Sequence, residues 1–183
     1  MPQPLDSIHH IAIEVKDIQE SLMRKNVDLK TALEMAKTAK EEGNKFFGQS
    51  RFKLAKKRYN QVIEMCEELG EFGEEQVDHI KNNLQLPSYL NLAAVALKER
   101  AWGNAIENCN SALEIDNKNV KGLYRRAQAH QGQKELEKAR DDLTRAVLAE
   151  PTNTAAQTLL AKIKTEITTA KEKEKKLYSR MFQ

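Results

Sequence analysis

The sequence predicts an all-α protein built from repeated helical hairpins. Charged residues make up 31% of the 183 positions and hydrophobic residues 40%, while only four prolines and seven glycines interrupt the chain. This balance favours long amphipathic helices over a β-sandwich or a barrel. An internal repeat supports the same fold class, because a fixed period of about 20 to 50 residues marks an array of similar helical or sheet units.

Two segments of the chain align without a gap at a distance of 34 residues. The segment Leu90–Ala94 aligns with Tyr124–Gln128, and each is followed by a large apolar residue and two alanines at matching places. Pro151 then lies five residues after the last of these alanines, which suits the end of a unit. We therefore predict units at residues 86–119 and 120–153. The later aligned pairs are Trp102 with Leu136, Ala105 with Ala139, and Ala112 with Ala146.

An earlier copy of the repeat precedes these two, with a longer spacing. The offset from Ala55 to Ala105 is 50 residues, which exceeds the repeat period by 16. The excess lies around Gly70 to Leu86, and it predicts an extended second helix and a longer connection in a first unit at residues 36–85. The matching positions are Gly43 with Ala93 and Ala127, and Phe52 with Trp102 and Leu136.

This period and residue pattern resemble the tetratricopeptide repeat. The resemblance implies two antiparallel helices in each unit and three units stacked in a right-handed superhelix. Stacking is required because one unit cannot bury its apolar face alone. Small residues at two places per unit would let the helices approach closely, and large apolar residues would fill the remaining space. The small residues are Gly43, Ala55, Ala93, Ala105, Ala127 and Ala139, and the large ones include Phe46, Tyr59, Leu97 and Leu143.

The chain after the third unit predicts one long helix over residues 154–183. Ala155, Leu159, Ile163 and Ile167 recur at a spacing of four, which is typical of an amphipathic helix. We expect this apolar stripe to cover the end of the third unit, as a capping helix does. The remaining segment, rich in lysine and glutamate, would continue into solvent.

Residues 1–28 do not fit the repeat and form a leader before a repeat domain at residues 29–183. Ile11, Ile13 and Val15 alternate with polar or small residues, which is the period of a half-buried strand. Two interpretations stay open, a flexible leader and the last strand of a preceding domain. Asp28 is an expected N-cap for a first long helix starting near Leu29.

The residues that usually carry catalysis or metal binding form no cluster in this sequence. Cys66 and Cys109 lie on predicted apolar helix faces, so we expect buried thiols and neither a disulfide nor a metal site. No Gly-rich phosphate loop, HExxH motif or nucleophile elbow occurs, and we expect no enzyme and no cofactor. Asp141 and Asp142 are adjacent on a helix and are expected to be solvated. The histidines, His9, His10, His79 and His130, make no metal-ligand pair.

Charge and hydropathy exclude two further classes of function. The net charge is only +3, basic residues alternate with acids, and Trp102 occupies a packing position, so nucleic-acid binding is not expected. No apolar run approaches the roughly 20 residues needed to cross a bilayer, and the N-terminus lacks a signal-peptide pattern. We expect a cytoplasmic protein, with the nucleus as a second compartment.

A set of cationic and amide side chains recurs on the first helices of the three units. Lys40 and Asn44 are four residues apart and share a helix face, as do Lys121 and Arg125, and Asn91 occupies the corresponding region of the second unit. Lysine and arginine are charged donors and asparagine is an amide donor, so together they suit two adjacent carboxylates. The sequence therefore predicts a groove that captures a C-terminal carboxylate.

This set resembles the two-carboxylate clamp of co-chaperone tetratricopeptide domains, and all five clamp positions are filled. The resemblance implies that Lys40, Asn44 and Asn91 hold the terminal main-chain carboxylate of the ligand. It also implies that Lys121 and Arg125 engage the side chain of the terminal Asp and the peptide beside it. The implied ligand is the MEEVD-type tail of heat-shock protein 90, with the tail of heat-shock protein 70 as a relative.

The segments AIENCNSALEIDNKNVKGLYRRAQA and EKEKKLYSRMF are similar to the C-terminal halves of large immunophilins of the FKBP and cyclophilin types. The resemblance implies a chaperone-binding motif at Lys175, Lys176, Leu177 and Tyr178, and a calmodulin site on the C-terminal helix as a weaker expectation. It also implies an isomerase domain that this chain does not contain, with parentage open between the two types. The alternative function is a general tetratricopeptide scaffold that binds another peptide or protein.

Overall fold

The computed structural model describes residues 29–68 and 78–181 of the chain. The expected strand at Ile11–Val15, the Asp28 cap, and residues 69–77 and 182–183 lie outside the described residues. Within the described ranges every regular element is helical, so the predicted all-α class is confirmed.

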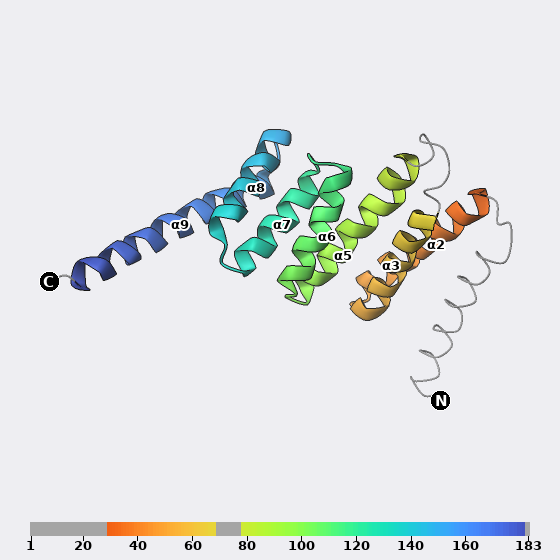
Figure 1. The fold of residues 1–183 in the computed structure, drawn as a ribbon, viewed down its shortest axis with the longest axis horizontal. Helices are drawn as coiled ribbons and strands as arrows, with labels where there is room; N and C mark the ends of the chain where they lie inside the picture. Colours follow the sequence, from red (N-terminus) through yellow and green to blue (C-terminus); the bar gives the residue numbers. More distant parts are fainter. Residues whose placement is uncertain (1–28, 69–77, 182–183) are drawn as a thin grey trace, which may run out of the picture.

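Three helical hairpins stand side by side and a single long helix follows them (Figure 1). The first hairpin pairs α2 (Leu29–Gly48) with α3 (Phe52–Glu68), and the second pairs α5 (Leu86–Lys98) with α6 (Trp102–Ile115). The third pairs α7 (Val120–Gly132) with α8 (Leu136–Ala149), and α9 (Thr154–Met181) completes the described chain. Each second helix begins at the large apolar residue that the repeat alignment matched.

The small residues predicted from the repeat lie where the helices of each hairpin touch. Ala55, Ala105 and Ala139 on the second helices have no exposed surface, and Ala93 and Ala127 on the first helices are equally buried. Two larger side chains, those of Tyr59 and Leu143, fill the hairpin interiors and are at most 1% exposed. Burying each such side chain stabilises the fold by roughly 1.5 to 3 kcal/mol.

The turns within the three hairpins share one backbone conformation. Ser50, Arg100 and Lys134 have φ values of 58°, 57° and 63°, which place them in the left-handed region although none is glycine. The residue after each one donates its backbone N–H to a carbonyl five residues earlier, as in Glu135 to His130 at 2.9 Å. This hydrogen bond satisfies a helix-terminal carbonyl and reverses the chain.

The extra residues between the first and second units are helical at residues 78–85, where the sequence predicted a connection, and the rest of the predicted connection lies outside the described residues. The chain is helical from residue 78 onward, and a π-helical segment at Lys81–Gln85 runs directly into α5. α3, at 17 residues, is longer than α6 and α8, at 14 residues each, as predicted for an extended second helix. Ile80 and Leu84 are buried against α2 and α3, so the insertion enlarges the core of the first hairpin.

α9 covers the third hairpin, as the predicted capping helix would. Ile163 is fully buried and Leu159 and Ile167 pack on the same cluster as the interior of the third hairpin. The expected stripe is wrong at one place, because Ala155 is exposed and Ala156 is buried instead. Asn153 accepts a hydrogen bond from the backbone N–H of Ala156, and it caps α9 as Asn119, 34 residues earlier, caps α7.

A buried ion pair in the third hairpin also differs from expectation. Asp141 is exposed, but Asp142 is only 5% exposed and accepts two hydrogen bonds from Arg126, at 2.6 and 2.8 Å. Asp142 lies on α8 toward α7, so its charge is compensated there by the guanidinium rather than by water. Such bidentate pairs hold two helices in one geometry.

Replacing Lys134 with glycine should raise the free energy of unfolding by about 0.5 to 1 kcal/mol, because glycine adopts a positive φ without the steric cost of a side chain. The adjacent residue Gln133 has a φ of −84°, so Gln133→Gly is the matched control and should lower stability. Thermal and urea unfolding measure both changes. A Lys134→Gly protein less stable than the wild type would contradict this account of the turns.

Candidate functional site

The five predicted clamp residues lie on the first helix of each hairpin. Lys40 and Asn44 lie on α2, Asn91 on α5, and Lys121 and Arg125 on α7. Four of these side chains form hydrogen bonds: Asn91 donates to Asn44, Arg125 to a carbonyl of the second hairpin, and Lys40 to a carbonyl of the segment before α5. The site is therefore a surface built by three successive hairpins.

The side-chain oxygen of Asn44 joins the first two hairpins. It accepts a hydrogen bond from Asn91 Nδ2 at 3.0 Å and another from the Tyr59 hydroxyl at 2.9 Å. Because its oxygen has both partners, the amide of Asn44 is fixed with its NH₂ group left as a donor. Asn91 likewise keeps one N–H that Asn44 does not use.

Tyr59 reaches Asn44 only because α2 has no side chain at Gly43. A Cβ built on Gly43 would lie 2.6 Å from Cε1 and 2.8 Å from Cδ1 of the Tyr59 ring. Burial raises the pKa of Tyr59 to about 12, although the nearby charge of Arg125 acts in the opposite direction. The hydroxyl therefore keeps its proton at neutral pH and donates it to Asn44.

Arg125 links the third hairpin to the second. Its Nη1 donates a hydrogen bond of 2.6 Å to the backbone carbonyl of Leu90 on α5. Burial lowers the pKa of Arg125, and interactions with Cys109 and Tyr59 partly oppose this change. An arginine remains protonated in such surroundings, so the site holds a partly desolvated positive charge.

Lys40 and Lys121 differ in how they are held. Lys40 Nζ donates to the backbone carbonyl of Asn83 at 3.0 Å, which ties it to the π-helical segment. Lys121 lies one turn before Arg125 on α7 and is exposed. Among the described residues its ammonium has no hydrogen-bond or ion-pair partner.

A groove of about 670 Å³ adjoins Arg125 and extends toward α9. Apolar side chains and polar groups both line it, and the polar ones are amides and cations. Sequence reasoning missed the contribution of α9, because Lys162 follows no repeat position. The lining residues besides Arg125 are Phe47, Leu97, Trp102, Lys98, Gln128, Gln131 and Lys162, with Ala94 and Gly132.

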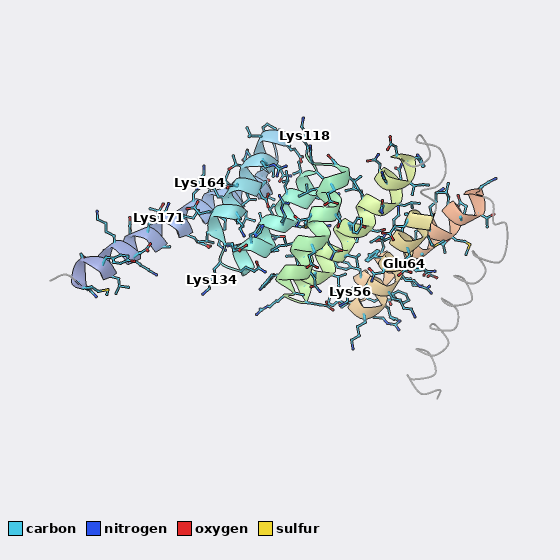
Figure 2. All side chains as sticks on the ribbon, viewed as in Figure 1. Lys56, Glu64, Lys118, Lys134, Lys164 and Lys171 are labelled. Carbon is cyan, nitrogen blue, oxygen red and sulfur yellow. The ribbon has the colours of Figure 1, made fainter. Side chains whose placement is uncertain are left out.

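The predicted tail motif lies apart from this groove. Lys175, Lys176, Leu177 and Tyr178 are on the exposed end of α9, where Leu177 is 61% and Tyr178 55% exposed. Figure 2 shows Lys171 on the part of α9 that extends away from the hairpins, and Lys171 forms an ion pair with Glu137 at 3.2 Å. The motif is accessible but is not brought to the five clamp residues.

The cysteines behave as the sequence predicted. Both are free and buried, and burial raises the pKa of each thiol to about 12, so neither is a reactive thiolate. His130 is buried against Glu135 at 2.7 Å, while His79 is exposed and hydrogen-bonded to Asn83. No group of three potential metal ligands occurs in residues 29–68 and 78–181. In the same ranges no helix is long and apolar enough to span a bilayer.

Comparison with known sequences identifies the repeat and one set of relatives. A family model for the tetratricopeptide repeat matches residues 96–163. Peptidyl-prolyl cis-trans isomerase FKBP4 of Bos taurus is 35% identical over 171 residues, which cover 93% of this chain and 37% of that protein. This chain thus spans little more than a third of the relative's length.

Solved structures with the same fold include proteins described as chaperone partners. The C-terminal domain containing tetratricopeptide repeats of a putative FK506-binding protein from Plasmodium falciparum has a TM-score of 0.71 and 25% identity, covering 80% of this chain and 97% of its own. The heat-shock protein 90 co-chaperone Cns1 of Saccharomyces cerevisiae has a TM-score of 0.67 and 28% identity, with coverages of 81% and 44%. The second such domain of human RPAP3, solved with the heat-shock protein 70 peptide SGPTIEEVD, has a TM-score of 0.53 and 26% identity, with coverages of 73% and 98%.

Replacing Gly43 with alanine should lower the free energy of unfolding by about 1 to 3 kcal/mol, because the new methyl group would overlap the buried ring of Tyr59. This loss should exceed the roughly 1 kcal/mol that alanine gains over glycine in helix propensity. Gly48→Ala, on the same helix, is the matched control, since a Cβ there meets nothing within 4 Å. Urea unfolding followed by circular dichroism compares the two variants, and a Gly43→Ala protein as stable as the wild type would disprove the close contact.

Proposed function

Because the chain is a tetratricopeptide repeat domain with homology to the repeat region of FKBP4, we propose that it captures the acidic C-terminal tail of a chaperone. The proposed ligand ends in an EEVD-type sequence, as in heat-shock protein 90 or heat-shock protein 70. The domain acts as a binding module without chemistry of its own, through a clamp for two carboxylates.

One observation carries this proposal, the arrangement of donors around Asn44. Its oxygen accepts hydrogen bonds from Tyr59 and Asn91, so the NH₂ group of Asn44 and the second N–H of Asn91 are left to donate to a ligand. The cation of Lys40 comes from the first hairpin, one turn before Asn44, and that of Arg125 comes from the third hairpin. A surface with free amide donors and positive charge suits carboxylate groups.

We assign to the clamp residues the roles that the sequence resemblance implies, and their placement on three successive hairpins supports this assignment. Lys40, Asn44 and Asn91 form the α2–α5 side and would hold the main-chain carboxylate of the last residue. Lys121 and Arg125, one turn apart on α7, would hold the side-chain carboxylate of the terminal Asp. The cations also attract an acidic tail before contact, and salt weakens this attraction. The adjoining groove at Arg125 would receive residues that precede the terminal Asp.

The structural relatives support the class of ligand proposed here. Cns1 is described as a heat-shock protein 90 co-chaperone, and the RPAP3 domain was solved with a peptide that ends in EEVD. Two free cysteines fit a reducing compartment, so we place the function in the cytoplasm or nucleus. The FKBP4 relative favours an FKBP-type parent over a cyclophilin-type one.

The α9 motif enters the proposal only as a second contact with the chaperone. Lys175, Lys176, Leu177 and Tyr178 are exposed and would touch parts of the chaperone other than the bound tail. Calmodulin, which the sequence resemblance suggested for this helix, is not part of the proposal, because Glu172 and Glu174 alternate with the lysines and offset their charge.

Lys121→Ala should weaken binding of a free-acid MEEVD peptide about tenfold or more, because a charge-assisted hydrogen bond contributes roughly 1.5 to 3 kcal/mol. Lys121 is exposed and unpartnered among the described residues, so the fold should not change. Lys118→Ala removes the same charge at the edge of the molecule, where Figure 2 places Lys118, and should leave the affinity nearly unchanged. Isothermal titration calorimetry measures the dissociation constants.

Changes in the peptide distinguish the two halves of the clamp. Amidating the C-terminus of the peptide should weaken its binding to the wild type strongly. The loss of affinity should be much smaller for Asn91→Ala, because this variant already lacks one contact with the terminal carboxylate. Changing the terminal Asp of the peptide to Asn should weaken binding to the wild type. The same change should have little effect on the affinity of Lys121→Ala, which already lacks the contact with the Asp side chain. Equal binding of the free-acid and amidated peptides, or no binding to the wild type, would favour the alternative of a general scaffold for another ligand.

A further inference from the structure

The helix that carries Asn91 contains a proline inside a continuous helical run. Residues 78–80 are α-helical, Lys81–Gln85 are π-helical, and α5 continues from Leu86 to Lys98. Pro87 therefore follows two turns of helix rather than starting one. Proline in such a place has no N–H to donate, and its ring collides with the carbonyl four residues earlier. The π-helical turn, with its wider hydrogen-bonded ring, accommodates the collision.

The carbonyl four residues before Pro87 is that of Asn83, and it is the one that Lys40 uses. In an α-helix the N–H of residue 87 would donate to this oxygen, and proline has none. Lys40 Nζ on α2 donates to it instead, at 3.0 Å and across 43 residues of sequence. The hydrogen bond typical of a π-helix, between residues five apart, closes the segment, where the Leu86 N–H donates to the Lys81 carbonyl.

Packing on both sides holds this carbonyl next to α2. Ile80 and Leu84 are each 2% exposed and belong to one cluster with Ala36 and Ala39 of α2. Ser88 is fully buried, and its hydroxyl donates to the Leu84 carbonyl at 2.7 Å. The π-helical segment thus has little freedom to move away from Lys40.

We propose that Pro87 is a positioning residue for the clamp, because it leaves the Asn83 carbonyl free to hold the Lys40 ammonium beside Asn44. This inference rests on the proposed function, in which Lys40 binds the terminal carboxylate. An ammonium has three N–H donors, so the bond to Asn83 leaves two for a ligand. A lysine already held in place loses less rotamer freedom on binding than a free one. The described part of the insertion, residues 78–85, thereby becomes part of the binding site.

Pro87→Ala tests the inference, since alanine supplies an N–H that competes with Lys40 for the Asn83 oxygen. The dissociation constant of the free-acid MEEVD peptide should rise about three- to tenfold, and the protein should unfold at the same temperature as the wild type or higher. In a Lys40→Ala background the same substitution should have no further effect on affinity. Asn83→Ala is the matched control, because it removes the side chain and keeps the carbonyl, so its affinity should match the wild type.

A measurement without ligand separates failure of this inference from failure of the proposed function. In ¹⁵N-lysine nuclear magnetic resonance of the free protein, the Lys40 ammonium should show slow proton exchange in the wild type and in Asn83→Ala, and fast exchange in Pro87→Ala. Unchanged exchange in Pro87→Ala would overturn the inference whether or not the peptide binds. Equal weakening by Pro87→Ala in the presence and absence of Lys40 would overturn it as well. A wild type that does not bind the peptide would instead reject the proposed function.

Discussion

The absence of a side chain at Gly43 lets the ring of Tyr59 lie directly against α2, and the groove depends on this contact. The buried ring brings its hydroxyl to Asn44, whose oxygen then also accepts a hydrogen bond from Asn91. Core packing in the first hairpin therefore sets the direction of amide donors on the surface of two hairpins. A similar close contact joins the second and third hairpins, since a Cβ on Gly132 of α7 would lie 2.5 Å from the Trp102 ring of α6.

The positive charges of the site are held to different degrees. Arg125 is partly buried and bonded to the Leu90 carbonyl, and Lys40 is bonded to the Asn83 carbonyl, so both are placed before any ligand arrives. Lys121 is exposed and has no partner among the described residues, so in the proposed complex the carboxylate of the ligand would be its first partner. An unstructured tail loses conformational freedom when it docks. If the donors of the protein are already fixed, the protein itself loses little further conformational freedom on binding. The proposed clamp thus combines a fixed part with one adjustable cation.

The sequence predicted the repeat architecture because small residues at a period of 34 report directly on where helices touch. It also predicted that the five proposed clamp residues lie on the first helix of each unit, where the structure has them, and the spacing of four within a helix follows from helix geometry. It failed where contacts between helices decide the outcome. Asp142 is buried because Arg126 of the adjacent helix forms an ion pair with it. The spacing of residues along one helix does not predict a contact between side chains of two helices. The helical part of the insertion was missed because the 34-residue alignment is interrupted there, and the bond of Lys40 to Asn83 crosses that interruption.

The central claim is that three hairpins present fixed donors to the two carboxylates of a chain terminus. The most direct measurement is a structure of this domain with a free-acid peptide ending in MEEVD. The account predicts that the main-chain carboxylate lies within hydrogen-bond distance of Lys40, Asn44 and Asn91, and the Asp side chain near Lys121 and Arg125. The Tyr59–Asn44–Asn91 hydrogen bonds should be the same with and without the peptide. A peptide bound elsewhere, such as along α9, or a groove whose amides rotate on binding, would contradict it.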